Sequence, residues 1–147
     1  MMSKPDGPSF ETTLHVRDSC MCLHVQRAAR ALARRFDEAL KPVGLTNQQF
    51  SLLMSLNRPE PPRMKEVALL LALDRTTLTA NLKPLERRGL AELRPDPRDR
   101  RGRRVALTEE GRNLLAQAVP LWRSMEDEIE GPLSDPDRLR ADLTALS

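Results

Sequence analysis

Apolar residues recur at three- and four-residue steps along much of the chain, the spacing of amphipathic helices. One such stripe predicts a long first helix over residues 16–41, with arginines on its opposite face. Its apolar positions are Met21, Val25, Ala28, Leu32, Phe36 and Leu40. Thr46, with Gln49 three residues later, forms a capping-box pattern. A second helix is therefore expected over residues 47–57.

A proline-rich turn follows, and after it the pattern predicts two short helices and two short strands. The helices are expected over residues 64–71 and 75–88, with Asp74 as the N-cap of the second. The short turn between them makes a helix-turn-helix. Alternation of apolar and polar residues over 90–93 and 105–107 then predicts a hairpin whose connection is rich in arginine.

The remainder of the chain predicts two more helices. Thr108 is expected to cap a helix of about twenty residues, which Gly131 and Pro132 end. Ser134 or Asp135 then caps a last short helix with an apolar leucine face.

These elements predict a single domain over residues 1–147 of mainly α (α+β) class. A winged helix-turn-helix over 46–108 lies between long terminal helices over 14–42 and 112–146. Those terminal helices carry more apolar surface than a small winged domain can cover, which predicts dimerisation through them. Charged residues make up 31% of the chain and hydrophobic residues 39%, as in soluble globular proteins.

The longest apolar run, residues 67–73, is too short to cross a bilayer. The first ten residues contain no apolar signal core, so no membrane partner and a cytoplasmic location are expected.

Charge is strongly segregated, although the net charge is only +3. Residues 87–104 contain eight arginines and three acids, a net charge of +5. Residues 126–142 contain seven acids and two arginines, a net charge of −5. A basic hairpin that follows a helix is what a winged helix presents to a phosphate backbone. The sequence therefore predicts that double-stranded DNA is the partner.

Catalytic chemistry is not indicated. The chain contains no glycine-rich phosphate loop. Its histidines and cysteines, His15, Cys20, Cys22 and His24, fall within ten residues of one expected helix, which cannot surround a metal tetrahedrally. Cys22 and His24 are two residues apart on that helix and do not face each other, which argues against a thiol enzyme. No catalytic site, metal or cofactor is expected.

Three segments resemble the MarR family of bacterial transcriptional regulators. They are GLTNQQFSLL after the first helix, DRTTLTANLKPLERRGL over the recognition helix, and DPRDRRGRRVALTEEGR over the wing. The resemblance covers roughly residues 14–146. It implies a homodimer held by the first and last helices, with two recognition helices about 34 Å apart reading a pseudo-palindromic operator.

The resemblance also suggests which side chains contact DNA. On the recognition helix they are Arg75, Thr76, Thr77, Thr79, Asn81 and Lys83. Ala80 stands where many members have an arginine, so direct base readout is expected to be sparser here. On the wing they are Arg98, Arg101 and Arg103, with Arg101 expected in the minor groove and paired with Asp74, which supports the wing.

Members of the family usually lose DNA affinity when a small, often aromatic anion binds between the dimer helices and the winged domain. His15, Arg30, Phe50 and Trp122 are candidates to lie near such a cleft. The sequence thus predicts a sequence-specific regulator, a repressor released from its operator by a small ligand.

The alternative signal is oxidation. Cys22 falls where the organic-hydroperoxide-sensing branch of the family has its reactive cysteine, and Cys20 is close by. A sensing thiol must be a thiolate, which the N-terminal end of a helix favours. That branch stabilises its thiolate with tyrosines, and this chain has none, so a ligand is the preferred signal. A disulfide between Cys20 and Cys22 on one helix is expected to be strained.

Overall fold

The computed structural model describes residues 6–147. The chain forms two compact units, which divide between Arg35 and Phe36, inside helix α2 (Met21–Leu40). The first unit contains α1 (Phe10–Ser19) and most of α2. None of the side chains of α1 is buried.

The helix expected from residue 16 to 41 is interrupted. Cys20 has an extended backbone, with φ −66° and ψ 110°, and separates α1 from α2. Helix α1 also begins earlier than the apolar stripe predicts, because Ser9 caps it by accepting a hydrogen bond from the Thr12 amide. Cys20 and Cys22 therefore do not share one continuous helix.

The second unit begins with the end of α2 and a short 3-10 helix, η1 (Lys41–Val43). It continues with α3 (Asn47–Leu56), α4 (Met64–Leu70) and α5 (Arg75–Arg87). The capping box predicted at Thr46 is confirmed. Its side chain accepts from the Gln49 amide at 3.2 Å, and the Gln49 side chain accepts from the Thr46 amide at 3.0 Å. Asp37 adds a further cap by accepting from the Asn47 backbone amide at 2.7 Å.

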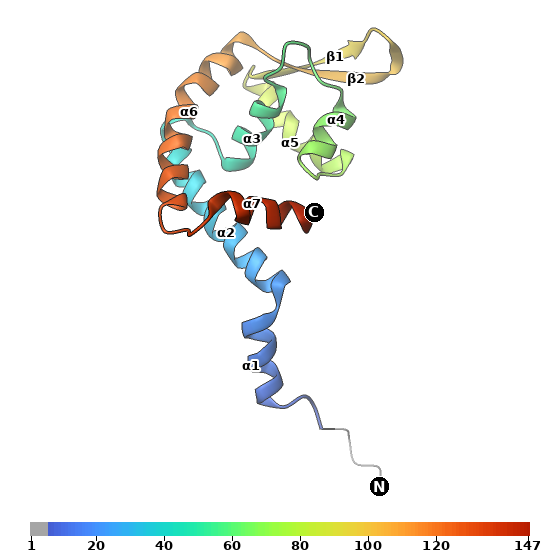
Figure 1. Cartoon of the computed structure of the whole chain (residues 1–147). Coiled ribbons are helices and arrows are strands. Elements are labelled where there is room, and N and C mark those ends of the chain that lie inside the picture. Colours follow the sequence, from blue (N-terminus) through green and yellow to red (C-terminus); the bar gives the residue numbers. More distant parts are fainter. Residues whose placement is uncertain (1–5) are drawn as a thin grey trace. The chain divides into compact units, whose positions relative to one another are not determined.

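The wing is an antiparallel hairpin of β1 (Ala91–Asp96) and β2 (Asp99–Leu107), seen beside α4 and α5 in Figure 1. Both strands extend further into the arginine-rich segment than the sequence pattern predicts. Arg94 pairs with Arg104, and Pro95 pairs with Arg103. A proline is tolerated here because each strand of a two-stranded sheet has a free edge.

One hydrophobic core holds the helix-turn-helix and the wing together. Its fully buried large side chains are Leu40, Leu53, Leu56, Val67, Leu78, Leu82, Leu85 and Val105. They come from the end of α2, from α3, α4 and α5, and from β2, so the recognition helix and the wing pack against the same interior.

Two helices complete the chain, α6 (Glu109–Glu130) and α7 (Pro136–Ala145). Thr108 caps α6 and Asp135 caps α7, the second being one of the two alternatives predicted. Arg140 of α7 joins them by its ion pair with Glu130 of α6 at 2.6 Å, and it also pairs with Asp137 of its own helix at 2.8 Å. Among residues 6–147, no helix has the length and apolar character needed to cross a membrane.

Candidate nucleic-acid interface

The recognition helix α5 is fixed by one buried face and one cap. Leu78, Leu82 and Leu85 are buried in the core. Asp74 accepts hydrogen bonds from the Thr77 amide at 2.7 Å and the Thr77 hydroxyl at 2.9 Å. The opposite face of the helix is thereby left exposed, and it carries Arg75, Thr76, Thr79, Ala80 and Lys83.

Two of the α5 residues expected to contact DNA, Thr77 and Asn81, are less exposed to solvent than the others. Thr77 is half-buried, and its hydroxyl donates to Asp74. Asn81 is also half-buried and lines a small cavity of about 230 Å³ that α3 residues Asn47 and Gln48 share. The exposed polar face of α5 is therefore narrower than the sequence alone suggests.

A basic groove lies between α5 and the wing. Arg75, Thr79 and Lys83 line it from the helix, and Arg103 lines it from β2. Leu82 and Leu93 contribute apolar surface, and the groove has a volume of about 230 Å³. Three cations and one carboxylate, that of Glu86, thus line one surface, whose net positive charge suits binding of a polyanion.

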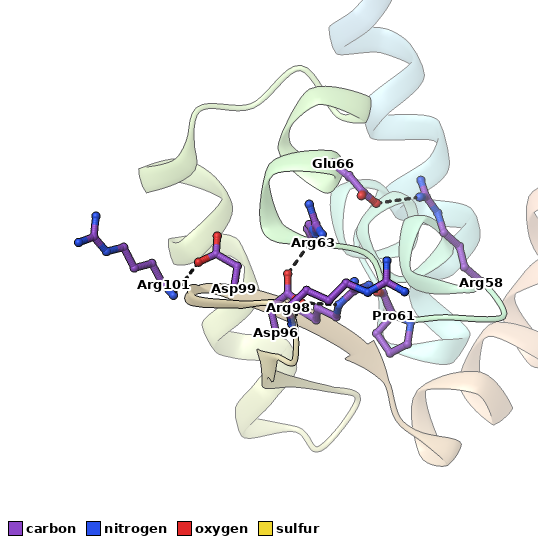
Figure 2. Close-up of polar contacts among 9 residues, drawn as sticks. Arg58, Pro61, Arg63, Glu66, Asp96, Arg98, Asp99 and Arg101 are labelled. Carbon is purple, nitrogen blue, oxygen red and sulfur yellow. Dashed lines mark hydrogen bonds and ion pairs between the residues drawn. The ribbon is translucent and has the colours of Figure 1, made fainter.

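The tip of the wing is exposed and basic. Arg98 and Arg101 are both exposed, and Figure 2 shows Arg101 pointing away from the carboxylates behind it. Asp99 accepts a hydrogen bond from the Arg101 backbone amide at 3.0 Å, which shapes the turn without engaging the Arg101 guanidinium. The guanidinium remains directed outward, as contact with a groove of DNA requires.

A buried carboxylate lies just behind this tip. The Asp96 side chain is only 1% exposed and contacts two arginine side chains (Figure 2). The Arg63 Nε lies 3.0 Å from Asp96 Oδ2, and the Arg104 Nε donates to Oδ1 at 3.3 Å. The Arg98 backbone amide also donates to Oδ1, at 3.0 Å.

Two aspartates of this region are held as anions. The Arg98 backbone hydrogen bond, with help from Arg104 and Arg63, lowers the pKa of Asp96 against the opposing effect of burial. Hydrogen bonds from the backbone and hydroxyl of Thr77 lower the pKa of Asp74. Both carboxylates therefore stay ionised at neutral pH.

The pair predicted between Arg101 and Asp74 is not among the contacts of residues 6–147, and it stays a prediction. Both oxygens of Asp74 are used at the N-terminus of α5, because an N-cap side chain turns back toward the first amides of its own helix. The aspartate that supports the wing is Asp96, and its arginines are Arg63 and Arg104.

Sequence reasoning missed Arg63, Asp96 and Arg104 as functional residues. Asp96 lies in a segment dense in charge, where a buried side chain has no hydropathy signal. Arg104 donates to the Pro61 carbonyl oxygen, 43 positions away in the chain, and such a contact leaves no local pattern. The Asp-Pro-x-Asp spacing is the one sequence feature that marks the position.

Comparisons with known proteins agree with this geometry. The sequence model of the MarR family matches residues 43–102, the segment that contains the helix-turn-helix and most of the wing. The regulator HosA of Escherichia coli O111:H- is 36% identical over 96 residues, which are 64% of this chain and 70% of HosA. The Mycobacterium tuberculosis regulator MosR in complex with DNA is 41% identical, with a TM-score of 0.81 over 87% of this chain and 93% of MosR.

The chain belongs to the MarR family. It is a transcriptional regulator and not an enzyme, and its winged helix-turn-helix fold is the one predicted. The transcriptional repressor CouR, bound to a 23-mer DNA duplex, is a further neighbour. It is 30% identical, with a TM-score of 0.75 over 89% of this chain and 92% of CouR. The partner of this MarR-family protein is DNA.

Proposed function

We propose that this protein is a sequence-specific repressor that a small aromatic anion releases from a pseudo-palindromic operator. The observation that carries this proposal is an apolar cavity of about 470 Å³ in the second unit. It is lined by residues of α3, α4 and α6. It therefore lies between α4, the first helix of the helix-turn-helix, and α6, the long helix that follows the wing. Its residues are Phe50, Ser51, Met54, Ser55, Leu70, Val119, Trp122 and Arg123.

The lining suits an aromatic ligand with one negative charge. Phe50 and Trp122 stack with ring centroids 6.3 Å apart and an interplanar angle of 16°. Aromatic rings favour offset stacking, so the ring of a bound ligand can extend the stack of Phe50 and Trp122. Arg123 supplies a cation beside an otherwise largely apolar lining, the combination that binds a carboxylate attached to a ring.

Release follows from where the cavity lies. A ligand between α3, α4 and α6 contacts both the helix-turn-helix and α6, so it favours one relative position of these elements over another. A ligand shifts such an equilibrium only as far as its affinities for the two positions differ. We expect the ligand-bound position to misplace the two recognition helices of a dimer relative to the operator.

Apolar surface that a single chain leaves uncovered supports the homodimer. Six large apolar side chains on or beside α1, α2 and α7 are between 42 and 74% exposed: Phe10, Val16, Met21, Leu139, Leu143 and Leu146. Groups of exposed large apolar side chains are typical of an interface. Sedimentation analysis should find a dimer at micromolar concentration, and a stable monomer would contradict this part of the proposal.

Trp122 provides the test of the ligand site, because it is the single tryptophan of the chain. Aromatic carboxylates such as salicylate, benzoate and p-coumarate are titrated while tryptophan fluorescence and anisotropy of a labelled operator are recorded. A compound that releases DNA should quench Trp122 over the same concentration range. Arg123→Gln should weaken release, and Arg138→Gln, on exposed α7, is the matched control. If the same compound concentration releases wild type and Arg123→Gln from the operator, and the Trp122 fluorescence is not quenched, the ligand binds elsewhere.

A second candidate signal is oxidation of Cys22. The break at Cys20 places Cys22 in the first turn of α2, exposed, with the Gln26 amide donating to its sulfur at 3.3 Å. An exposed thiol at a helix N-terminus is accessible to peroxide, and the break removes the continuous helix that would strain a disulfide with Cys20. Cys22→Ser should still bind the operator and still respond to the ligand. Rapid release by stoichiometric organic hydroperoxide from wild type, and none from Cys22→Ser, would make oxidation the signal.

A further inference from the structure

The carboxylate of Asp96 is a buried negative charge within a positively charged wing that is proposed to bind DNA. The hairpin around it is strongly basic, and the exposed arginines Arg98 and Arg101 follow it in sequence. Its own side chain is 1% exposed. A carboxylate in this position lowers the positive potential that attracts DNA, so electrostatic attraction gives no reason for it. Its role has to be sought in the contacts that it makes.

Those contacts join the wing to the segment that leads into the helix-turn-helix. Arg104, on β2, donates to Asp96 and also donates to the Pro61 carbonyl oxygen at 2.7 Å. Arg63, the residue directly before α4, forms an ion pair with the other oxygen of Asp96. Asp96 itself ends β1. One carboxylate thus links β1, β2 and the start of the helix-turn-helix (Figure 2).

Backbone pairing supports the same joint. Arg63 forms an isolated antiparallel bridge with Arg104, and the Val105 amide donates to the Pro62 carbonyl oxygen at 2.9 Å. Residues 61–63 therefore lie along β2. The core holds the base of the wing, and the side chains of Asp96, Arg63 and Arg104 hold the part of the hairpin beyond the core against the segment before α4.

The two ion pairs differ in character. Arg104 is 18% exposed and makes aligned hydrogen bonds to two acceptors, whereas Arg63 is 46% exposed. Asp96 Oδ2, which faces Arg63, is buried and has no aligned hydrogen bond. A buried carboxylate left without its cations is costly, so Asp96 holds both arginines in place.

We propose that Asp96 is a positioning residue for sequence-specific DNA binding, which holds the wing at the angle that lets wing and recognition helix contact DNA together. It acts through Arg63 and Arg104 and does not contact DNA itself. Loss of the carboxylate leaves the hairpin more positive and its outer part less firmly held. The inference rests on the proposed contact between wing and DNA, and it goes beyond that contact by assigning the specificity to a buried residue.

The test compares Asp96→Asn with Asp99→Asn. Both changes remove one negative charge from the same hairpin, and Asp99 bonds only to the backbone amide of Arg101 among the contacts described. Affinities are measured for the selected operator and for a random duplex of equal length. Asp99→Asn should change both affinities by a similar factor. Asp96→Asn should retain or raise random-duplex affinity while its ratio of specific to random affinity falls about tenfold, as expected when one groove contact is misplaced.

Two further variants keep the outcome decisive. If Asp96→Asn does not fold, as judged by its thermal unfolding, Arg63→Gln replaces it, because Arg63 is half-exposed and its loss leaves Arg104 in place. Its specificity ratio should fall by a smaller factor. Equal ratios for Asp96→Asn and Asp99→Asn, or an unchanged ratio for a folded Arg63→Gln, would overturn the positioning role. Arg101→Ala distinguishes a wrong positioning role from a wrong assignment of the wing as a DNA contact. If the wing does not contact DNA, Arg101→Ala binds the operator with wild-type affinity. If only the positioning role is wrong, Arg101→Ala still binds more weakly.

Discussion

Gly111 lies where α6 passes closest to the base of the wing, and replacing it with alanine should destabilise the protein. It ends the Leu-Thr-x-x-Gly pattern that begins at Leu107, and its amide donates to the Thr108 hydroxyl at 3.0 Å. A Cβ at this position would lie 2.2 Å from the Leu90 carbonyl oxygen and 2.7 Å from Leu107 Cδ1. A methyl group on Cα has no rotamer that avoids the first contact, and the carbonyl belongs to the backbone.

The magnitude follows from two opposing effects. Alanine is favoured over glycine within a helix by about 1 kcal/mol. Forcing a methyl group into a packed site costs about 1–3 kcal/mol, and a contact with backbone belongs at the upper end of that range. The net expectation is a loss of about 2 kcal/mol, which for a chain of this size lowers the Tm by about 4–8 °C.

Thermal unfolding of Gly111→Ala beside Gly131→Ala tests this reasoning. Gly131 follows the same helix with an ordinary helical backbone, and the nearest atom to a Cβ there is 3.5 Å away. Gly131→Ala should therefore melt at or slightly above the wild-type temperature. A Gly111→Ala protein that melts as high as wild type would refute the close contact between α6 and the wing.

Three further predictions follow from the site and the termini. Arg101→Ala should lower operator affinity about tenfold and flatten the dependence of log K on log salt without lowering the Tm; wild-type binding would remove the wing from the interface. Asp37 has its pKa lowered by the backbone and side-chain amides of Asn47, so its contribution to stability is complete above its ordinary value of 3.8 and lost as the pH falls through the lower folded-state value. Asp37→Asn should therefore flatten the acid limb of a plot of Tm against pH, and an unchanged acid limb would argue against this linkage. Arg140→Gln should loosen α7 and raise the dimer dissociation constant in sedimentation experiments more than Arg138→Gln does; equal effects would show that the α6–α7 ion pairs do not support the dimer.

Local signals account for the parts of the fold that the sequence predicts well. The caps at Thr46, Asp74 and Thr108 each use a side chain that bonds an amide three residues later, so sequence spacing suffices to find them. The part of α1 before residue 16 escaped prediction because none of the side chains of α1 is buried, and no apolar stripe marks it.

The candidate site divides in the same way. The basic hairpin and the exposed face of α5 are visible in composition and spacing alone. The partners of Asp96 are not, because they come from the proline-rich turn before α4, far away in the chain. Asp74 caps α5 in the structure, and its predicted pairing with Arg101 stays a prediction.

Selection of duplexes from a random-sequence DNA library tests the central claim most directly. A homodimer with two recognition helices should enrich a pseudo-palindromic site with half-sites about 34 Å, or one helical turn, apart. The same site should be protected when the intact protein is footprinted on it. Recovery of sequences without shared half-sites, bound no more tightly than the starting library, would contradict the account.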